Sequence, residues 1–199
     1  MKKDFKTAKE IFHKLYKDID GYKISLNSRS KLNLSSNELI YGEIDFDSFA
    51  QILEFINPDE NTIFYDLGSG TGKPCIAISL LYKIKKAVGI ELLPDLCQIA
   101  KDIYKKLKEI QPEINEIEYR CENILESDFS DGTLIFTQAT CFSDETLEII
   151  NKKIEEMNKG TKIVIITKPL KSDKLKLIFE NSMKMAWGIG TTRIYEKII

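Results

Sequence analysis

A glycine-rich turn in the first half of the chain restricts the fold more than any other feature of the sequence. An apolar run at residues 63–65 leads into Asp-Leu-Gly-Ser-Gly-Thr-Gly at residues 66–72, and a helical pattern begins at Pro74. A strand, a glycine turn and a helix N-terminus in this order form a ligand-binding crevice in α/β sheets, because the backbone can approach the ligand and free N–H groups face it. We therefore predict an α/β fold with a ligand bound at this turn.

The spacing of the glycines separates two classes of cofactor. A dinucleotide fingerprint reads G-x-G-x-x-G, which would need a third glycine where Lys73 stands, whereas this turn reads G-x-G-x-G. Asp66 lies two residues ahead of the first glycine, where a carboxylate repels a pyrophosphate and attracts a cation. S-adenosylmethionine carries an ammonium and a sulfonium and no phosphate, so we predict it as the cofactor. The turn contributes Gly68, Ser69, Gly70, Gly72 and Lys73 to the expected cofactor site, together with Asp66.

Short apolar runs alternate with helical patterns after residue 60, which predicts a mostly parallel sheet with helices on both faces. The expected strands are 62–66, 87–91, 116–121, 133–138 and 162–168, and the expected helices are 74–84, 95–110, 144–158 and 173–182. Apolar segments at 183–187 and 192–198 flank two glycines, which indicates an antiparallel hairpin. The expected fold class is therefore a Rossmann-like, seven-stranded methyltransferase sheet, mostly parallel with a C-terminal antiparallel hairpin.

The N-terminal quarter precedes this pattern. Residues 1–45 are expected to form a helical extension that includes a segment covering the cofactor, and residues 46–199 the methyltransferase domain. Apolar positions at helical spacing predict an amphipathic helix over residues 4–19, whereas the Ser- and Asn-rich residues 20–40 predict a loop. A second helix is expected to begin at Asp45 and to end before Pro58.

Composition and charge exclude several functional classes. The net charge of −2 does not suit a protein that stays bound to nucleic acid. No apolar run approaches the ~20 residues that cross a bilayer, so no membrane partner is expected. His13 is the only histidine, so neither histidine catalysis nor a metal site is expected. Cys75, Cys97, Cys121 and Cys141 lack metal-type spacing and are expected to be reduced thiols in a cytoplasmic protein.

Polar residues at the ends of two further strands complete the expected cofactor site. Glu91 ends the second strand, where an acid can accept hydrogen bonds from both ribose hydroxyls of an adenosine; this position suits NAD equally well. Asn123 follows the third strand and is expected to meet the adenine amino edge, with Ile124 packed on the ring face. Glu122 competes for the same role, and Asn123 in a purely turn-forming role is the alternative.

The end of the fourth strand is expected to border the reacting methyl group. Phe136 and Phe142 are expected to wall a narrow apolar channel there, while the polar groups of Thr137, Gln138 and Thr140 orient a nucleophile. Simple core packing of both phenylalanines is the alternative.

The stretch between Lys31 and Lys73 contains no lysine or arginine but many acidic residues. If part of it rims the pocket, the local field favours a cationic cofactor and a cationic substrate. The alternative is that most of these acids are solvated helix caps and faces.

Three segments together carry a family resemblance. Tyr-Gly-Glu at residues 41–43, Asp-Ser-Phe at residues 47–49 and the glycine turn at 66–72 resemble the non-SET histone lysine methyltransferases of the disruptor-of-telomeric-silencing family. The similarity runs from about residue 39 to residue 169. It implies that Tyr41, Gly42, Glu43 and Ile44 fold over the methionine end of S-adenosylmethionine.

The resemblance also implies an activity, namely methyl transfer to a lysine of a protein partner. The catalytic candidates are Tyr41, Gln138 and Thr140. Gln138 is the nearest match to the family's active-site residues, and either Tyr41 or Thr140 would orient the amine. The chain departs from the family by Asn123 in place of an aspartate and by Gln-Ala-Thr at residues 138–140 in place of Asn-Asn-Phe. A methyltransferase acting on a small molecule or RNA, and a regulatory domain that binds the cofactor without catalysis, remain alternatives.

Overall fold

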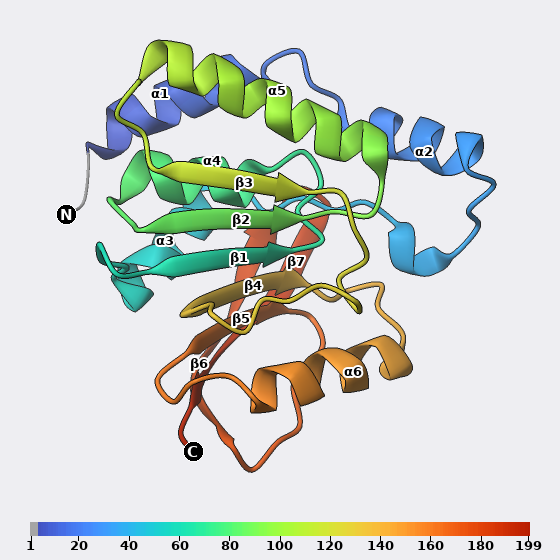
Figure 1. The fold of residues 1–199 in the computed structure, drawn as a ribbon, viewed down its shortest axis with the longest axis vertical. Helices are drawn as coiled ribbons and strands as arrows, with labels where there is room; N and C mark the ends of the chain where they lie inside the picture. The colour runs from blue at the N-terminus through green and yellow to red at the C-terminus, as the bar shows by residue number, and fades with distance from the viewer. Residues whose placement is uncertain (1–3) are drawn as a thin grey trace.

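Seven strands form one mixed sheet in the computed structural model, which describes residues 4–199; residues 1–3 of the expected extension lie outside the described residues. The strand order is β3-β2-β1-β4-β5-β7-β6, with β7 antiparallel to both of its neighbours and the other pairs parallel (Figure 1). The strands are β1 (Ile63–Leu67), β2 (Lys86–Ile90), β3 (Glu116–Arg120), β4 (Leu134–Gln138), β5 (Lys162–Ile166), β6 (Leu175–Met185) and β7 (Gly188–Lys197). The predicted methyltransferase sheet with its C-terminal hairpin is confirmed.

Helices cover both faces of the sheet. They are α1 (Phe5–Tyr16), α2 (Gly21–Lys31), the 3-10 helix η1 (Asn37–Leu39), α3 (Phe46–Ile56), α4 (Lys73–Leu81), α5 (Pro94–Ile110) and α6 (Asp144–Glu155). Helices α1, α3, α4 and α5 share one hydrophobic core with one face of the sheet, and α6 forms a second core on the other face. None of the helices in the described part of the chain is long and apolar enough to span a bilayer.

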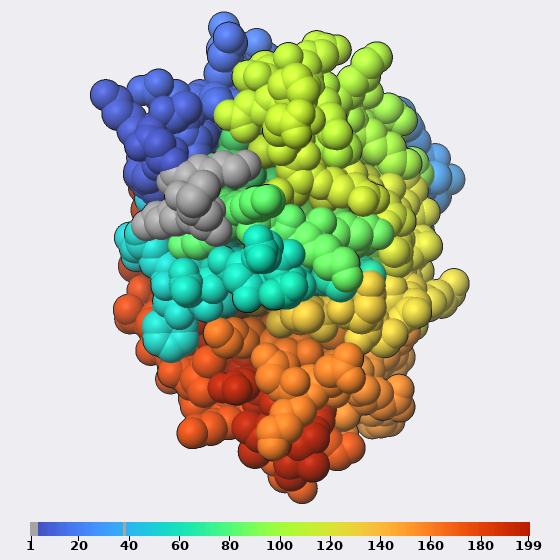
Figure 2. Space-filling model, turned by 60° about the vertical axis from the view of Figure 1, so that its left-hand side comes forward, coloured from blue at the N-terminus to red at the C-terminus, as the bar shows by residue number. Residues whose placement is uncertain are grey.

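Strand β1 shows why the central strands are apolar on both faces. Phe64 belongs to the core beneath α3 and α4, whereas its neighbour Tyr65 belongs to the core beneath α6. Successive side chains of a strand point to opposite faces, so a central strand of a covered sheet must be apolar almost throughout. Helices α1 and α2 lie with α5 at one end of the molecule, and the C-terminal strand β6 lies toward the other end (Figure 1, Figure 2).

Helix α3 begins and ends where its capping residues predict. The Asp45 side chain accepts a hydrogen bond from the Ser48 backbone N–H, which satisfies a donor that the first helical turn leaves free. Asn57 ends the helix in the left-handed conformation, with φ of 53°. The predicted second helix is therefore confirmed.

The predicted loop over residues 20–40 is wrong in its first half, where α2 lies. Asp20 caps this helix by accepting the Lys23 backbone N–H. Helix α2 contacts α5, and its buried residues include Ser25 and Ser28. Small polar residues form the buried face, so a search for apolar periodicity misses the helix.

The predicted helix over residues 173–182 is also wrong, because this stretch forms most of strand β6. It pairs with β7 from Leu175 opposite Lys197 to Met185 opposite Gly188, with one irregularity near residues 177–179. The lysines, leucines and glutamate of the stretch are helix formers in isolation. Backbone pairing along the whole of β7 overrides that preference, since β propensity depends on tertiary context.

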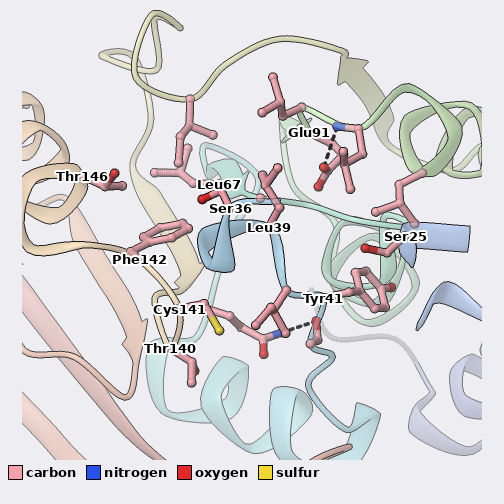
Figure 3. Close-up of a pocket in the computed structure, with 18 of the residues that line it drawn as sticks. Ser25, Ser36, Leu39, Tyr41, Leu67, Glu91, Thr140, Cys141, Phe142 and Thr146 are labelled. Carbon is pink, nitrogen blue, oxygen red and sulfur yellow. Dashed lines mark hydrogen bonds between the residues drawn. The ribbon is translucent and has the colours of Figure 1, made fainter. Parts of the chain in front are cut away.

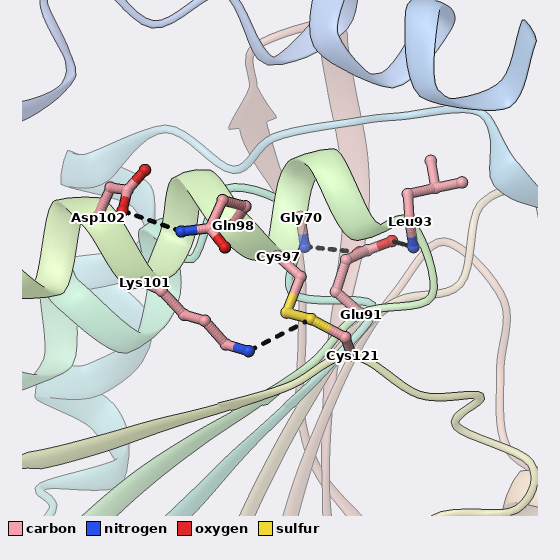
Figure 4. The surroundings of a disulfide bond; sticks show 8 residues. All are labelled: Gly70, Glu91, Leu93, Cys97, Gln98, Lys101, Asp102 and Cys121. Atoms are coloured by element: carbon pink, nitrogen blue, oxygen red, sulfur yellow. Dashed lines mark hydrogen bonds between the residues drawn. A yellow bond between two sulfur atoms is a disulfide. The ribbon is translucent and has the colours of Figure 1, made fainter. Parts of the chain in front are cut away.

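Two of the four cysteines form a disulfide, which corrects the expectation of four reduced thiols. Cys97 in α5 and Cys121 after β3 are bonded, with their Cα atoms 5.8 Å apart (Figure 4). Packing of α5 beside the end of β3 brings together residues that are 24 positions apart, a proximity that their spacing does not reveal. Cys75 is a buried free thiol and Cys141 a half-buried one. The expected cytoplasmic location stays a prediction.

Reduction of this disulfide is expected to lower the free energy of unfolding by about 3 kcal/mol, the loop-entropy effect of a cross-link that closes a loop of this size. Urea unfolding with and without dithiothreitol measures the change. The double variant Cys97→Ala/Cys121→Ala is the control and should unfold at the same urea concentration in both buffers. A wild-type midpoint that does not move on reduction would contradict this account.

Candidate functional site

The glycine turn joins β1 to α4 and packs against two tyrosines, Tyr41 and Tyr119. Gly70 has φ of 54° and Gly72 φ of 81°, in the left-handed region that side chains disfavour. A Cβ at Gly70 would lie 2.4 Å from the Tyr41 ring, and one at Gly72 would lie 2.3 Å from the Tyr119 hydroxyl. Both the backbone conformation and the close packing of the two tyrosines therefore require glycine.

A cavity of about 640 Å³ lies beyond the carboxyl ends of β1, β2 and β4 (Figure 3). In the close-up, Phe142 and Thr146 lie on one side of it and Ser25 and Tyr41 on the other. Its lining comes from the α2–η1 region, the strand ends, the loops after β3 and β4 and the β6–β7 hairpin. The lining residues are Tyr22, Ser25, Leu34, Ser36, Leu39, Ile40, Tyr41, Gly42, Leu67, Gly68, Glu91, Leu92, Leu93, Leu96, Asn123, Ile124, Leu125, Gln138, Thr140, Cys141, Phe142, Thr146 and Trp187.

Glu91 connects the glycine turn to the start of α5. One of its carboxylate oxygens accepts the Gly70 backbone N–H at 2.8 Å and the other accepts the Leu93 backbone N–H at 2.8 Å (Figure 4). Burial raises the pKa of Glu91, and these backbone hydrogen bonds oppose that rise. Each carboxylate oxygen keeps a further lone pair. Glu91 therefore fixes the cavity wall and can still accept hydrogen bonds from a ligand.

Asn123 and Ile124 line the same cavity, and the competing Glu122 does not. The Asn123 side-chain oxygen accepts the Leu125 backbone N–H at 3.0 Å, and its carbonyl oxygen accepts the Ser127 hydroxyl at 2.7 Å. Asn123 thus forms the turn and also faces the cavity, where its NH₂ group is the part that can donate to a ligand. The turn-forming role and the ligand-facing role predicted for Asn123 are therefore compatible with each other.

A small hollow of about 10 Å³ adjoins the main cavity beside the glycine turn. Within the described part of the chain, Asp66 Oδ2, Ser69 Oγ and Gln138 Oε1 are buried without a hydrogen-bond partner. Burial first, and then the nearby Glu91, raise the pKa of Asp66 well above its usual range. Unpaired buried polar groups are costly to a fold, so three of them around one hollow indicate a ligand with hydrogen-bond donors.

Tyr41 and Glu43 form a connected group at the edge of this hollow. The Tyr41 hydroxyl donates to Glu43 at 2.7 Å and lies 2.9 Å from the Thr71 hydroxyl. The other carboxylate oxygen of Glu43 forms an ion pair with Lys73, and the two side chains are 13% and 18% exposed. Burial and then the Glu43 charge raise the pKa of Tyr41. The hydroxyl proton of Tyr41 is donated to Glu43 and its oxygen lies within hydrogen-bond distance of Thr71. Tyr41 therefore holds the Glu43 side chain in place.

The segment that carries Tyr41 is tied down on two sides. The Tyr41 ring fills space that a Cβ at Gly21 or Gly70 would occupy, so it packs between α2 and the glycine turn. Beyond it, the Ala186 backbone N–H donates to the Glu43 carbonyl oxygen at 2.9 Å. The chain around residue 42 thereby covers the glycine turn and joins it to the tip of the β6–β7 hairpin.

The end of β4 carries the other candidates predicted from the sequence. Gln138 and Thr140 both line the cavity, and the Gln138 side-chain NH₂ donates to the Gly42 carbonyl oxygen at 3.4 Å. Phe142 lines the cavity as expected, but the expectation for Phe136 is wrong. Phe136 lies in mid-strand, is fully buried and packs edge-on against Phe49 of α3 with ring centroids 5.2 Å apart. Residues of β4 must lie at or past the strand end to reach the cavity, as Gln138 and Thr140 do.

Most acids of residues 32–72 whose side chains are described follow the alternative prediction, as helix caps and surface charges, and none of them lines the main cavity. Asp45 caps α3, Asp47 forms an ion pair with Lys9, and Asp59 holds a turn. Among the described residues, Glu91 is the one acid that lines the main cavity, and Glu43 and Asp66 border the small hollow. Large apolar side chains of the lining are instead partly exposed at the mouth, namely Leu34, Ile40, Leu92 and Trp187.

Sequence reasoning missed two parts of the wall. Trp187 at the hairpin tip approaches Gly42, where a Cβ would lie 3.1 Å from its indole nitrogen. The signal for it was a tryptophan beside two glycines in a hairpin connection. Tyr22 and Ser25 come from α2, whose existence the sequence pattern hid.

Comparison with known proteins places the chain among methyltransferases. The family model described as "Histone methylation protein DOT1" matches residues 22–195. The "Histone-lysine N-methyltransferase, H3 lysine-79 specific" of Caenorhabditis elegans is 28% identical over 153 residues, covering 71% of this chain and 16% of that protein.

Solved structures share the fold. An RNA methyltransferase from Salinibacter ruber in complex with S-adenosyl-L-homocysteine has 21% identity and a TM-score of 0.60, covering 76% of this chain and 91% of that chain. Magnesium protoporphyrin IX methyltransferase from Synechocystis PCC 6803, with bound SAM, has 9% identity and a TM-score of 0.62, covering 96% and 91%.

The unpaired Asp66 is expected to make stability depend on pH. Because its pKa is raised in the folded state, the folded protein keeps this proton to higher pH than the unfolded chain, and stability falls as pH rises above about 4. The stability of Asp66→Asn relative to wild type should therefore increase as pH rises above about 4, as measured by urea unfolding.

Asp59→Asn is the matched control with the opposite sign. A backbone hydrogen bond from Asn61 lowers the pKa of Asp59, which is exposed, so ionised Asp59 adds stability above its unfolded pKa. Asp59→Asn should lose stability relative to wild type as pH rises. Parallel curves for Asp66→Asn and wild type would contradict the assignment of a buried, unpaired carboxyl.

Proposed function

Because the chain belongs to the DOT1 family of histone methylation proteins, we propose that it is an S-adenosylmethionine-dependent methyltransferase acting on a protein lysine. The C. elegans relative carries a lysine methyltransferase activity in its name, and this chain spans about a sixth of that protein's length. One observation of the structure carries the proposal. The Oδ2 atom of Asp66 is buried without a hydrogen-bond partner in the small hollow, which adjoins the main cavity that Glu91 lines.

The two acids suit opposite ends of this cofactor. The hollow beside Asp66 and Gln138 offers unpaired acceptors to the ammonium of the methionine end, and the nearby Glu43 is already paired with Lys73. On the other wall, Glu91 has acceptor capacity for ribose hydroxyls, and Asn123 with Ile124 would hold the adenine. These polar groups therefore fit S-adenosylmethionine, and the glycine turn lies between the groups proposed for its methionine end and those proposed for its adenosine end.

A phosphate-containing cofactor fits this site poorly. Asp66 and Glu91 are both acids, and no lysine or arginine is found among the described residues that line the main cavity. A pyrophosphate would meet the buried Asp66, and the lysine that lines the same small hollow, Lys73, is already paired with Glu43. The charge of the site thus favours a cationic ligand over NAD.

The reaction requires alignment and exclusion of water more than acid–base groups. When bound, S-adenosylmethionine supplies a methyl group activated by its sulfonium. The lysine amine must be neutral to use its lone pair, and the apolar mouth formed by Leu34, Ile40 and Trp187 lowers the pKa of an entering ammonium by desolvation. The proton then leaves to solvent before transfer, so no histidine is needed.

The neighbouring apolar and polar groups have separate tasks in this account. Trp187 and Phe142 bound the space through which the side chain enters, and Gln138 holds the covering segment by its hydrogen bond to Gly42. Thr140 presents a hydroxyl to the cavity, whereas the Tyr41 hydroxyl is turned to Glu43 and Thr71. Of the two groups proposed to orient the amine, Thr140 is the better placed.

Calorimetric titration is expected to show binding of S-adenosylmethionine and no appreciable binding of NAD. Glu91→Gln should weaken S-adenosylmethionine binding by about 1.5–3 kcal/mol, the scale of hydrogen bonds to a charged group. Glu122→Gln is the matched control, because Glu122 is exposed and does not line the cavity, and it should bind as wild type does. Equal affinity of wild type for NAD would sink the cofactor assignment.

The acceptor is expected to be a protein lysine. A lysate treated with the enzyme and S-adenosylmethionine carrying a labelled methyl group should yield label on lysine side chains, identified by mass spectrometry. Asp66→Asn, which should fold but lose the ammonium contact, is the matched control and should leave protein unlabelled. Label confined to RNA or to small metabolites would refute the lysine acceptor while leaving methyl transfer intact.

A further inference from the structure

Thr167 has an unusual backbone at the carboxyl end of β5. Its φ of 77° lies in the left-handed region, which a β-branched residue rarely adopts. The other non-glycine residues with positive φ in the described part of the chain are Asn33 and Asn57, and asparagine tolerates this conformation. Such strain persists only where the surrounding structure enforces it, and it concentrates at functional sites.

Two hydrogen bonds hold the backbone of Thr167 in this conformation. Its backbone N–H donates to the Thr191 carbonyl oxygen at 2.7 Å, and its own carbonyl oxygen accepts from the Arg193 guanidinium at 2.8 Å. Arg193 is itself fixed by an ion pair with Glu180. Strands β7 and β6 therefore impose the backbone conformation on the end of β5.

The consequence of this conformation is a hydroxyl pair at the cavity. Thr167 Oγ1 lies 2.9 Å from Thr140 Oγ1. Thr140 lines the cavity beside Cys141, as the close-up shows (Figure 3). Thr167 is not among the described residues that line the cavity, so it lies behind Thr140. A hydroxyl has one proton and two acceptor lone pairs. When Thr140 donates to Thr167, its proton points away from the cavity and its lone pairs remain available to a ligand.

We propose that Thr167 is a positioning residue that fixes Thr140 as a hydrogen-bond acceptor for an N–H of the substrate amine. The inference rests on the proposed function and deepens it. A neutral primary amine has two N–H bonds and one lone pair, so holding one N–H at Thr140 restricts the direction of the lone pair. The Thr140 hydroxyl keeps its own proton throughout, and the bonds made and broken at the methyl carbon are those of the proposed reaction.

Two substitutions separate this role from a structural one. Thr167→Gly removes both the hydroxyl and the steric conflict of a side chain at positive φ, so the variant should fold and melt at a temperature no lower than wild type. It should raise KM for the protein acceptor about 3- to 10-fold, the scale of one neutral hydrogen bond. Thr167→Ser keeps the hydroxyl and should restore KM to near the wild-type value. The dissociation constant of S-adenosylmethionine should be unchanged in both.

Asn57→Gly is the matched control. It also relaxes a non-glycine residue with positive φ, but it lies at the end of α3 and does not line the cavity. It should leave KM unchanged. A Thr167→Gly variant with wild-type KM, or a Thr167→Ser variant as impaired as Thr167→Gly, overturns the inference.

A binding measurement keeps the test independent of turnover. Threonine methyl NMR of the protein loaded with S-adenosylhomocysteine, titrated with Nα-acetyl-lysine methylamide at high pH, reports on Thr140 directly. The Thr140 methyl signal should shift in wild type and in Thr167→Ser, and much less in Thr167→Gly. If it shifts in this way but no protein is ever methylated, the proposed function fails and the inference stands. If the probe leaves the Thr140 signal of wild type unmoved, the inference is overturned.

Discussion

The pair of hydrogen bonds that the Glu91 carboxylate accepts, one at each oxygen, is the interaction on which the ligand cavity depends. The carboxylate accepts one backbone N–H from the glycine turn and one from the start of α5, so a single side chain sets the separation of the β1–α4 and β2–α5 connections. The wall is reinforced from outside by the Cys97–Cys121 bond, which joins α5 to the segment after β3 (Figure 4). Asn123 follows within two residues of that bond. The part of the cavity wall that carries Glu91 and Asn123 is therefore held by hydrogen bonds and by a covalent cross-link.

The two buried acids of the site differ in what the protein does for them. Glu91 is satisfied by backbone N–H groups, whereas Asp66 has an oxygen without a partner and a raised pKa. An unpaired buried carboxyl lowers stability, and natural proteins retain such groups where binding requires them. Asp66, Ser69 and Gln138 together form a set of acceptors that a bound ammonium would satisfy. In this view the fold gives up stability beside the glycine turn in exchange for affinity for a cation.

Much of the fold and part of the site were predictable because local chemistry determined them. The glycine turn, the Asp45 cap and the left-handed Asn57 each depend on backbone conformations that few residues adopt, so the sequence reveals them. Glu91 and Asn123 were found because the carboxyl ends of parallel strands meet at one edge of a sheet.

Most of the errors concern tertiary contacts that the spacing of residues in the sequence does not reveal. Helix α2 is buried through glycine and serine, β6 follows from its pairing with β7, and the disulfide follows from packing of α5 against β3. Trp187 reaches the cavity because the hairpin folds over residue 42. The strained Thr167 likewise results from contacts with β7 and from no local sequence signal. Tertiary packing therefore decided the parts of the wall that face a substrate.

Asp66 is proposed to receive the cationic end of S-adenosylmethionine. Isothermal titration calorimetry at a series of pH values above about 4, in buffers of different ionisation enthalpy, measures the protons exchanged on binding. Because the pKa of Asp66 is raised in the free protein, binding should release protons from wild type over part of this series and should release fewer from Asp66→Asn. Binding without proton release, or with equal release in the two proteins, would contradict this proposal.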